Sequence, residues 1–190
     1  MPEAPSFGDR RGAIADAVIG IASTRGLDRA SVREVATAAG VAIGTVQHYF
    51  STKDEMLSFA FHRVLERTLA RVKSVAPEAD VRRRLSRVLR ELLPLDEERH
   101  SEATVYLAFS SRAATTPALA EVQARTFRQI RAAFIEIFRQ ASSKDPEIDA
   151  LLVLAVVDGL ALSAVSAPAE TRYQELERAL DAYLDRRFAA

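Results

Sequence analysis

SVREVATAAGVAIGTVQHYFSTKDEML, residues 31–57, is the stretch that decides the fold. Ser31 and Thr52 are each followed three residues later by a glutamate, which is the spacing of a capping box at the start of a helix. Gly40 marks a tight turn, because glycine adopts the left-handed backbone conformation that other residues resist. The stretch therefore predicts two short helices joined by a tight turn, followed by a long helix that ends near Ser74.

A small apolar set can pack these two short helices against each other at a steep angle. Its members are Val35, Ala36, Val41, Val46 and Phe50. Such a helix-turn-helix places its second helix in the major groove of DNA, which is about 12 Å wide. Glutamine can bond adenine there through two hydrogen bonds, so Gln47 and its neighbour His48 are candidates for base contacts. The alternative is a solvated polar patch.

The rest of the chain also has the apolar spacing of helices, and no strand pattern appears. Proline and capping residues divide it into segments, as at Thr116-Pro117 and Asp145-Pro146. We predict an all-α protein of about nine helices. Residues 1–50 would form a three-helix helix-turn-helix domain, and residues 51–190 a regulatory and dimerisation domain that begins with a linking helix at about 52–74.

Overall charge does not decide whether the chain binds DNA, since 26 basic and 26 acidic residues give a formal net charge of zero. The absence of cysteine excludes disulfides, thiolate metal sites and a cysteine nucleophile. No nucleotide-binding, zinc-protease or serine-hydrolase motif occurs, so we expect no enzymatic activity, no cofactor and no metal. Without a signal pattern or a long unbroken apolar run, we expect a cytoplasmic protein with no membrane partner.

Residues 10–60 resemble the TetR family of transcriptional regulators. The matching positions are Gly40, Val41, Thr45, Tyr49, Phe50, Lys53, Asp54 and Leu57. The resemblance implies a dimeric, ligand-responsive DNA-binding regulator, most simply a repressor that binds a palindromic operator and is released by a small apolar or amphipathic effector. Gln47 stands where the family usually has tyrosine, which leaves the operator sequence open.

The predicted DNA contacts combine this resemblance with the outward positions of the motif. Thr45 and Tyr49 suit phosphates, which position a protein without specifying a sequence, although Tyr49 can also be structural. Lys53 is the residue with which the family grips the DNA backbone. The full predicted set is Arg33, Ile43, Gly44, Thr45, Gln47, His48, Tyr49, Thr52 and Lys53.

An effector pocket in the regulatory part is implied mainly by the resemblance. Its helices are rich in phenylalanine and aliphatic residues, which favours an apolar or amphipathic ligand, although helical aromatics often serve only as core. The predicted lining residues are His100, Tyr106, Phe109, Arg112, Phe127, Ile130 and Phe134.

The last two helices carry more apolar surface than a monomer needs, which predicts a four-helix homodimer interface, with packing inside one chain as the alternative. The predicted interface residues are Leu151, Leu154, Val157, Leu162, Tyr173, Leu176, Leu180, Tyr183 and Leu184.

Two other functions remain open. The first is an activator on the same scaffold, which a promoter-reporter assay would separate from a repressor. The second is a helical interaction protein that does not bind DNA, which a binding assay with the purified protein and its own upstream DNA would test.

Overall fold

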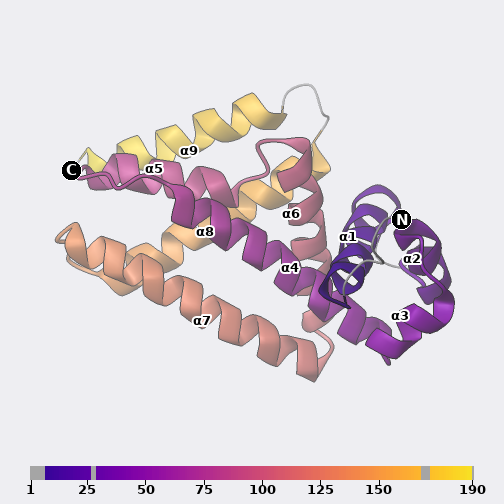
Figure 1. Ribbon diagram of the computed structural model, residues 1–190. Coiled ribbons are helices and arrows are strands. Elements are labelled where there is room, and N and C mark those ends of the chain that lie inside the picture. The colour runs from indigo at the N-terminus through magenta and orange to yellow at the C-terminus, as the bar shows by residue number, and fades with distance from the viewer. Residues whose placement is uncertain (1–6, 27–28, 168–171, 190) are drawn as a thin grey trace.

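The computed structural model describes residues 7–26, 29–167 and 172–189, and its regular elements in these ranges are nine α-helices and no strand (Figure 1). The helices are α1 (Phe7–Arg25), α2 (Val32–Ala39), α3 (Ile43–Tyr49), α4 (Lys53–Ser74), α5 (Val81–Leu92), α6 (Glu97–Ala113), α7 (Pro117–Gln140), α8 (Pro146–Ser166) and α9 (Arg172–Phe188). The predicted all-α fold with an N-terminal helix-turn-helix is confirmed.

The local signals around the motif act as the sequence predicts. The Ser31 hydroxyl accepts a hydrogen bond from the Glu34 backbone N–H at 3.2 Å, and the Thr52 hydroxyl accepts one from the Glu55 N–H at 3.1 Å. Gly40 ends α2 in the left-handed conformation, with φ of 66°. The two caps fix where α2 and α4 begin, and the turn at Gly40 fixes where α2 ends.

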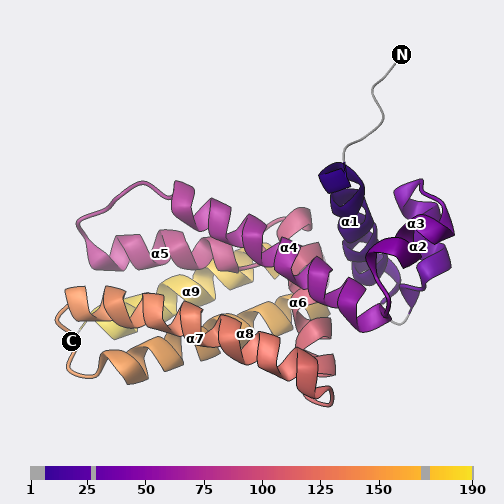
Figure 2. The same cartoon turned by 60° about the horizontal axis from the view of Figure 1, so that its bottom comes forward.

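Helices α1, α2 and α3 gather at one end of the molecule, and the remaining helices form an elongated body (Figure 2). Helix α4 runs from the end of the motif into this body. Helix α6 packs against α1 as well as against α4, α7 and α8. The motif is therefore joined to the body through two helices, one continuous with it in sequence and one that contacts it in space.

Three apolar clusters hold these parts together. The first joins α1–α4 and includes Val105 from α6, and the second joins α5, α7, α8 and α9. The third lies at the junction, where the Phe61 and Phe109 rings stack with centroids 3.9 Å apart and planes 5° from parallel. Stacked aromatic rings add attraction beyond the burial of their area, so this pair ties α4 to α6.

The apolar stripe of α9 lies inside the protomer, which corrects part of the predicted dimer interface. Its leucines pack with α5 and α8 because the protomer core needs an apolar face on that side. The buried members of the predicted interface are Val157, Leu176, Leu180 and Leu184. Leu154, Tyr173 and Tyr183 are half-buried, whereas Leu151 and Leu162 are exposed.

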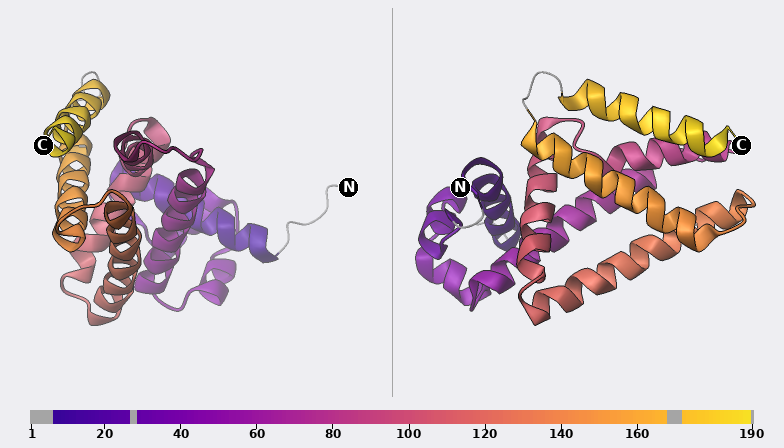
Figure 3. Two further views of the ribbon diagram at one scale, coloured as in Figure 1. Left: turned by 90° about the vertical axis from the view of Figure 1, so that its left-hand side faces the viewer. Right: turned by 180° about the vertical axis from the view of Figure 1, so that it is seen from behind.

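Helix α8 keeps a broad apolar surface that the protomer does not cover. By length and composition alone it could cross a membrane, and only 28% of its most apolar stretch is buried. In Figure 3, α8 and α9 lie side by side at the outer edge of the body, with no other helix beyond them. Leu152 and Leu162 are exposed on this helix, Leu162 by 56%.

A charged cluster joins α4, α5 and α6 inside the body. Among the described residues, Glu102 is the one charged residue that is buried, with 3% of its surface exposed. Its carboxylate accepts hydrogen bonds from Arg71 at 2.6 and 3.3 Å, and Glu91 lies 3.5 Å from both Arg71 and Arg99. Burial lowers the pKa of Arg71, but the hydrogen bond and charge of Glu102, together with the charges of Glu91 and Glu98, outweigh this and raise it, so Arg71 stays charged.

Replacing Arg71 by methionine should destabilise the protein because Glu102 would keep its buried charge without its partner. We expect Arg71→Met to lower the free energy of unfolding by about 3 kcal/mol, measured by urea denaturation. The control is Arg125→Met, which removes an exposed ion pair with Glu121 and should cost at most ~0.5 kcal/mol. Equal losses in the two variants would contradict a structural role for the buried pair.

Candidate DNA-binding surface and effector cavity

The nine predicted DNA-contacting residues lie on α2, α3 and the start of α4, at the end of the molecule farthest from α9. Six of them are exposed, namely Arg33, Ile43, Gly44, Gln47, His48 and Thr52. Thr45, Tyr49 and Lys53 are half-buried. Val46 is the buried residue of α3, and Tyr49 packs against the same apolar cluster, so Ile43, Gly44, Gln47 and His48 form the outward surface of this short helix.

The position of α3 is set by apolar packing and by one cation. Val35, Ala36, Val46 and Phe50 are buried in one cluster with Val41 packed against it, as the sequence predicts. On the other side of Phe50, the Arg11 guanidinium lies 5.6 Å from the Phe50 ring centroid and 4.3 Å from that of Phe59. These contacts orient α3 so that its exposed residues face away from the core, as the residues of a recognition helix must.

A cavity of about 420 Å³ lies in the body between α4, α5, α6, α7 and α8, and is called here the α6–α8 cavity. Its walls are mostly apolar and include Leu65, Leu92, Phe127 and Ile130. Its size is in the range of small-molecule sites in proteins, and apolar walls with few polar groups are typical of such sites.

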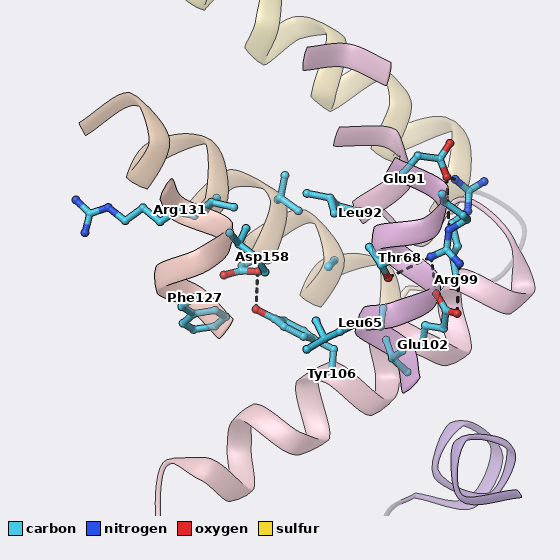
Figure 4. A pocket seen from close by; sticks show the side chains of 18 of the residues that line it. Leu65, Thr68, Glu91, Leu92, Arg99, Glu102, Tyr106, Phe127, Arg131 and Asp158 are labelled. Atoms are coloured by element: carbon cyan, nitrogen blue, oxygen red, sulfur yellow. Dashed lines mark hydrogen bonds and ion pairs between the residues drawn. The ribbon is translucent and has the colours of Figure 1, made fainter. Parts of the chain in front are cut away.

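Two sets of polar side chains are joined by hydrogen bonds or ion pairs at this cavity, and Arg128 and Arg131 of α7 also line it. In Figure 4, Tyr106 and Asp158 point toward each other beside Phe127, and the Tyr106 hydroxyl donates a hydrogen bond to the Asp158 carboxylate at 3.1 Å. The group of Glu91, Arg99 and Glu102 lies at the opposite end. A ligand in the cavity would therefore meet one polar pair at the α6–α8 side and a charge-balanced cluster at the α4–α5 side.

Asp158 is the carboxylate with which a ligand could interact at the first of these places. Burial raises the pKa of Asp158, while the Tyr106 hydrogen bond partly opposes this shift. Burial also raises the pKa of Tyr106, so its hydroxyl keeps its proton and stays a donor. Asp158 still reaches the open cavity, so its second oxygen can accept a hydrogen bond from an incoming donor.

A second cavity, of about 880 Å³, lies between α4, the segment 75–78, α5 and α7, and is called here the α4–α7 cavity. It shares Leu65, Thr68, Leu92 and Ile130 with the α6–α8 cavity, so the two adjoin along these residues. Phe134 contributes to its wall. Together the two cavities offer an apolar space that extends beyond the Tyr106–Asp158 pair.

The structure brings together only some of the predicted effector residues. Tyr106, Phe127 and Ile130 line the α6–α8 cavity, and Phe134 and Ile130 line the other. His100 is half-buried and lines neither cavity.

Phe109 and Arg112 require correction as effector contacts. Phe109 is fully buried in the junction, where its ring is occupied by Phe61. Arg112 lies one turn further along α6, where its Nε donates to Asp54 of α4 at 2.7 Å. Helical spacing identified the apolar side of α6 correctly. Toward the C-terminal end of the helix, however, this side contacts α4 and does not line the cavity.

Sequence reasoning missed Asp158, Arg71 and Glu102 as cavity residues. Asp158 did leave a signal, because it is the one charge within the apolar run LLVLAVVDGLALSAV of α8. A carboxylate in such a run is costly to bury without a partner or a function. Arg71 and Glu102 lie in ordinary amphipathic segments, where no pattern marks them.

Two family models match the chain. Residues 14–58 match the model of bacterial regulatory proteins of the TetR family, and residues 81–189 match that of the BetI-type transcriptional repressor, C-terminal.

Among curated relatives, the transcriptional regulator PksA of Bacillus subtilis is 31% identical over 185 residues, which cover 95% of this chain and 90% of PksA. The repressor KstR2 of Mycobacterium tuberculosis is 25% identical over 148 residues, covering 76% of this chain and 74% of KstR2.

Solved structures agree in fold. A transcriptional regulator from Rhodococcus sp. Rha1 is 44% identical, with a TM-score of 0.87 over 93% of this chain and 94% of that one. A protein from Saccharomonospora viridis, solved in complex with choline, has a TM-score of 0.81 at 18% identity, over 94% of this chain and 96% of that one. The chain belongs to the TetR family, and it is a ligand-responsive DNA-binding transcriptional regulator whose C-terminal part is of the BetI type.

Proposed function

We propose that the protein is a cytoplasmic, homodimeric repressor that binds a palindromic operator and is released by an amphipathic effector. Residues 1–50 bind DNA, residues 51–190 bind the effector and form the dimer, and α4 links the two. The observation that carries this proposal is the position of α6. Val105 of α6 packs in the core of the DNA-binding helices, while the neighbouring Tyr106 lines the α6–α8 cavity.

In this proposal α3 enters the major groove, with Gln47 and His48 toward bases and Lys53 toward a phosphate. Lys53→Ala should weaken binding to all DNA sequences about equally. The plot of log K against log salt has a negative slope, and this slope should become shallower. Its magnitude should decrease by about 0.9 for each phosphate that the protein no longer neutralises, or by about two for a dimer. Fluorescence anisotropy with labelled upstream DNA at several salt concentrations measures both effects.

Lys73→Ala is the matched control, because Lys73 lies in the last turn of the same helix, away from the motif. Its salt slope should stay that of the wild type. A Lys53→Ala protein with an unchanged slope would remove Lys53 from the phosphate contacts.

A second copy of the chain is the partner that best covers α8. The exposed face beside α9 is apolar over much of its length, and large exposed apolar patches mark association sites. A two-fold dimer would bury this face in both copies at once. It would also set the distance between the two α3 helices, which must be about 34–36 Å to enter successive major grooves.

Leu162→Glu tests this interface without disturbing the protomer core, because Leu162 is exposed in the single chain. A charge buried in the interface without a partner should cost several kcal/mol and yield a folded monomer that has lost operator affinity. Analytical ultracentrifugation measures the mass, and Leu162→Met should remain dimeric. A dimeric Leu162→Glu protein would exclude this face.

The effector would place an apolar chain in the cavities and a hydrogen-bond donor at Asp158. A cationic head suits this carboxylate, whereas an anionic head would be repelled by it. Choline, which is bound in the Saccharomonospora viridis protein, is one compound to test, but at 18% identity that protein is a guide to fold alone. The adjoining α4–α7 cavity leaves room for a longer chain.

Decylamine and decanoate, used below their micelle concentrations, have similar chains and opposite charges. Decylamine should raise the melting temperature and release operator DNA, and decanoate should do neither. Phe127→Ala should reduce the response to decylamine but keep operator binding, since Phe127 is partly exposed and its truncation disturbs little core. Glu121→Ala, on the same helix and outside both cavities, is the control. Release by decanoate alone would contradict the role of Asp158.

A further inference from the structure

The recognition helix carries an exposed apolar side chain and neither of the two strongly basic residue types. Its sequence from Ile43 to Tyr49 is IGTVQHY, which lacks both arginine and lysine. The Ile43 side chain is 45% exposed at the first position of α3. From residue 10 onward in α1, and in α2 and α3, no other large apolar side chain is exposed to this degree. The protomer covers little more than half of this side chain, so the remaining apolar surface is available to another molecule.

Gly44 points to the same surface. Glycine in the middle of a helix costs about 0.5–1 kcal/mol relative to alanine, and part of this cost applies at Gly44, the second residue of α3. A Cβ atom built on Gly44 would meet no atom of the chain within 4 Å. The fold therefore does not require glycine here, whereas close approach of another molecule to the α3 backbone would.

The chemistry of the major groove identifies what Ile43 fits. Adenine, guanine and cytosine present polar atoms there, and thymine alone presents a methyl group. A polar base edge would lose its water to Ile43 without a new hydrogen bond, which costs free energy. The commonest contact with guanine uses arginine or lysine, and α3 has neither.

We propose that Ile43 packs against the C5-methyl group of one thymine in each operator half-site, with Gly44 allowing α3 to approach that base. This inference rests on the operator binding proposed above and adds the base that is read. Gln47, one helical turn from Ile43, faces the same groove and suits a neighbouring adenine.

Deoxyuridine supplies a direct test, because it pairs as thymine does and lacks only the methyl group. The operator is first obtained by selecting random duplex DNA on the purified protein. Each half-site thymine is then replaced by deoxyuridine in turn, and Kd is measured by fluorescence anisotropy.

At one thymine per half-site, replacement should weaken wild-type binding about fourfold, the equivalent of ~0.8 kcal/mol for one buried methyl group. Replacement in both half-sites should weaken it about fifteenfold, if the two contacts add. Ile43→Ala should bind the thymine and deoxyuridine operators equally, whereas Ile43→Val should keep most of the difference.

Gly44→Ala separates this role from a structural one. Alanine should raise the melting temperature, because it favours the helix, and should weaken operator binding at least tenfold by holding α3 away from the base. A stabilised variant with unchanged affinity would overturn the close approach. If no thymine-to-deoxyuridine replacement weakened the wild-type protein more than it weakened Ile43→Ala, the methyl contact would be overturned. The operator binding proposed above would still stand. A selection that enriches no sequence would overturn operator recognition itself, and this inference with it.

Discussion

The sharing of α6 between two packed regions is the constraint on which the rest of the structure depends. Val105 is buried with the DNA-binding helices, Phe109 stacks on Phe61 at the junction, and Tyr106 lines the cavity. Because a helix turns about 100° per residue, Val105 and Tyr106 leave α6 about 100° apart, with Phe109 between them on the same side. A displacement of α6 is therefore felt at the cavity, at α4 and at α1 together. Ion pairs between Asp16 and the α4 arginines, and between Arg112 and Asp54, tie the same three helices at the surface.

The motif could be predicted from the sequence because its determinants are local. A capping serine, a left-handed glycine and apolar residues at fixed spacing each act within a few residues of themselves, so they define α2 and α3 without reference to distant parts of the chain. Fold class followed from the same signals repeated along the chain. The cavity depends on which helices meet in space, and spacing identifies only the side of a helix that turns inward. Tyr106 and Phe109 lie on the same side of α6, yet one meets Asp158 and the other meets Phe61.

The dimer interface shows the same limit in another form. The sequence spacing of Leu176, Leu180 and Leu184 is that of a helix interface. In the structure these leucines are buried within the single chain, where they pack against α5 and α8. What is left over is on α8, which is apolar around most of its circumference and therefore serves a core and a surface at once. On such a helix the spacing of apolar residues does not distinguish a buried face from an exposed one. Only the packed structure separates the side taken by the protomer from the side that remains for a partner.

These placements define how a ligand could act in the proposed dimer. Helix α8 would be held by the second copy, whereas α6 is attached to the DNA-binding helices through Val105. The hydrogen bond from Tyr106 to Asp158 links the held helix to the attached one. A ligand donor that takes the place of the Tyr106 hydroxyl at Asp158 would break this link and remove one of the contacts that hold α6 against α8. Such a ligand changes the equilibrium only by the difference in its affinity for the two arrangements. A ligand that merely fills the apolar space, and binds equally well with the link open or closed, would stabilise the protein without releasing DNA.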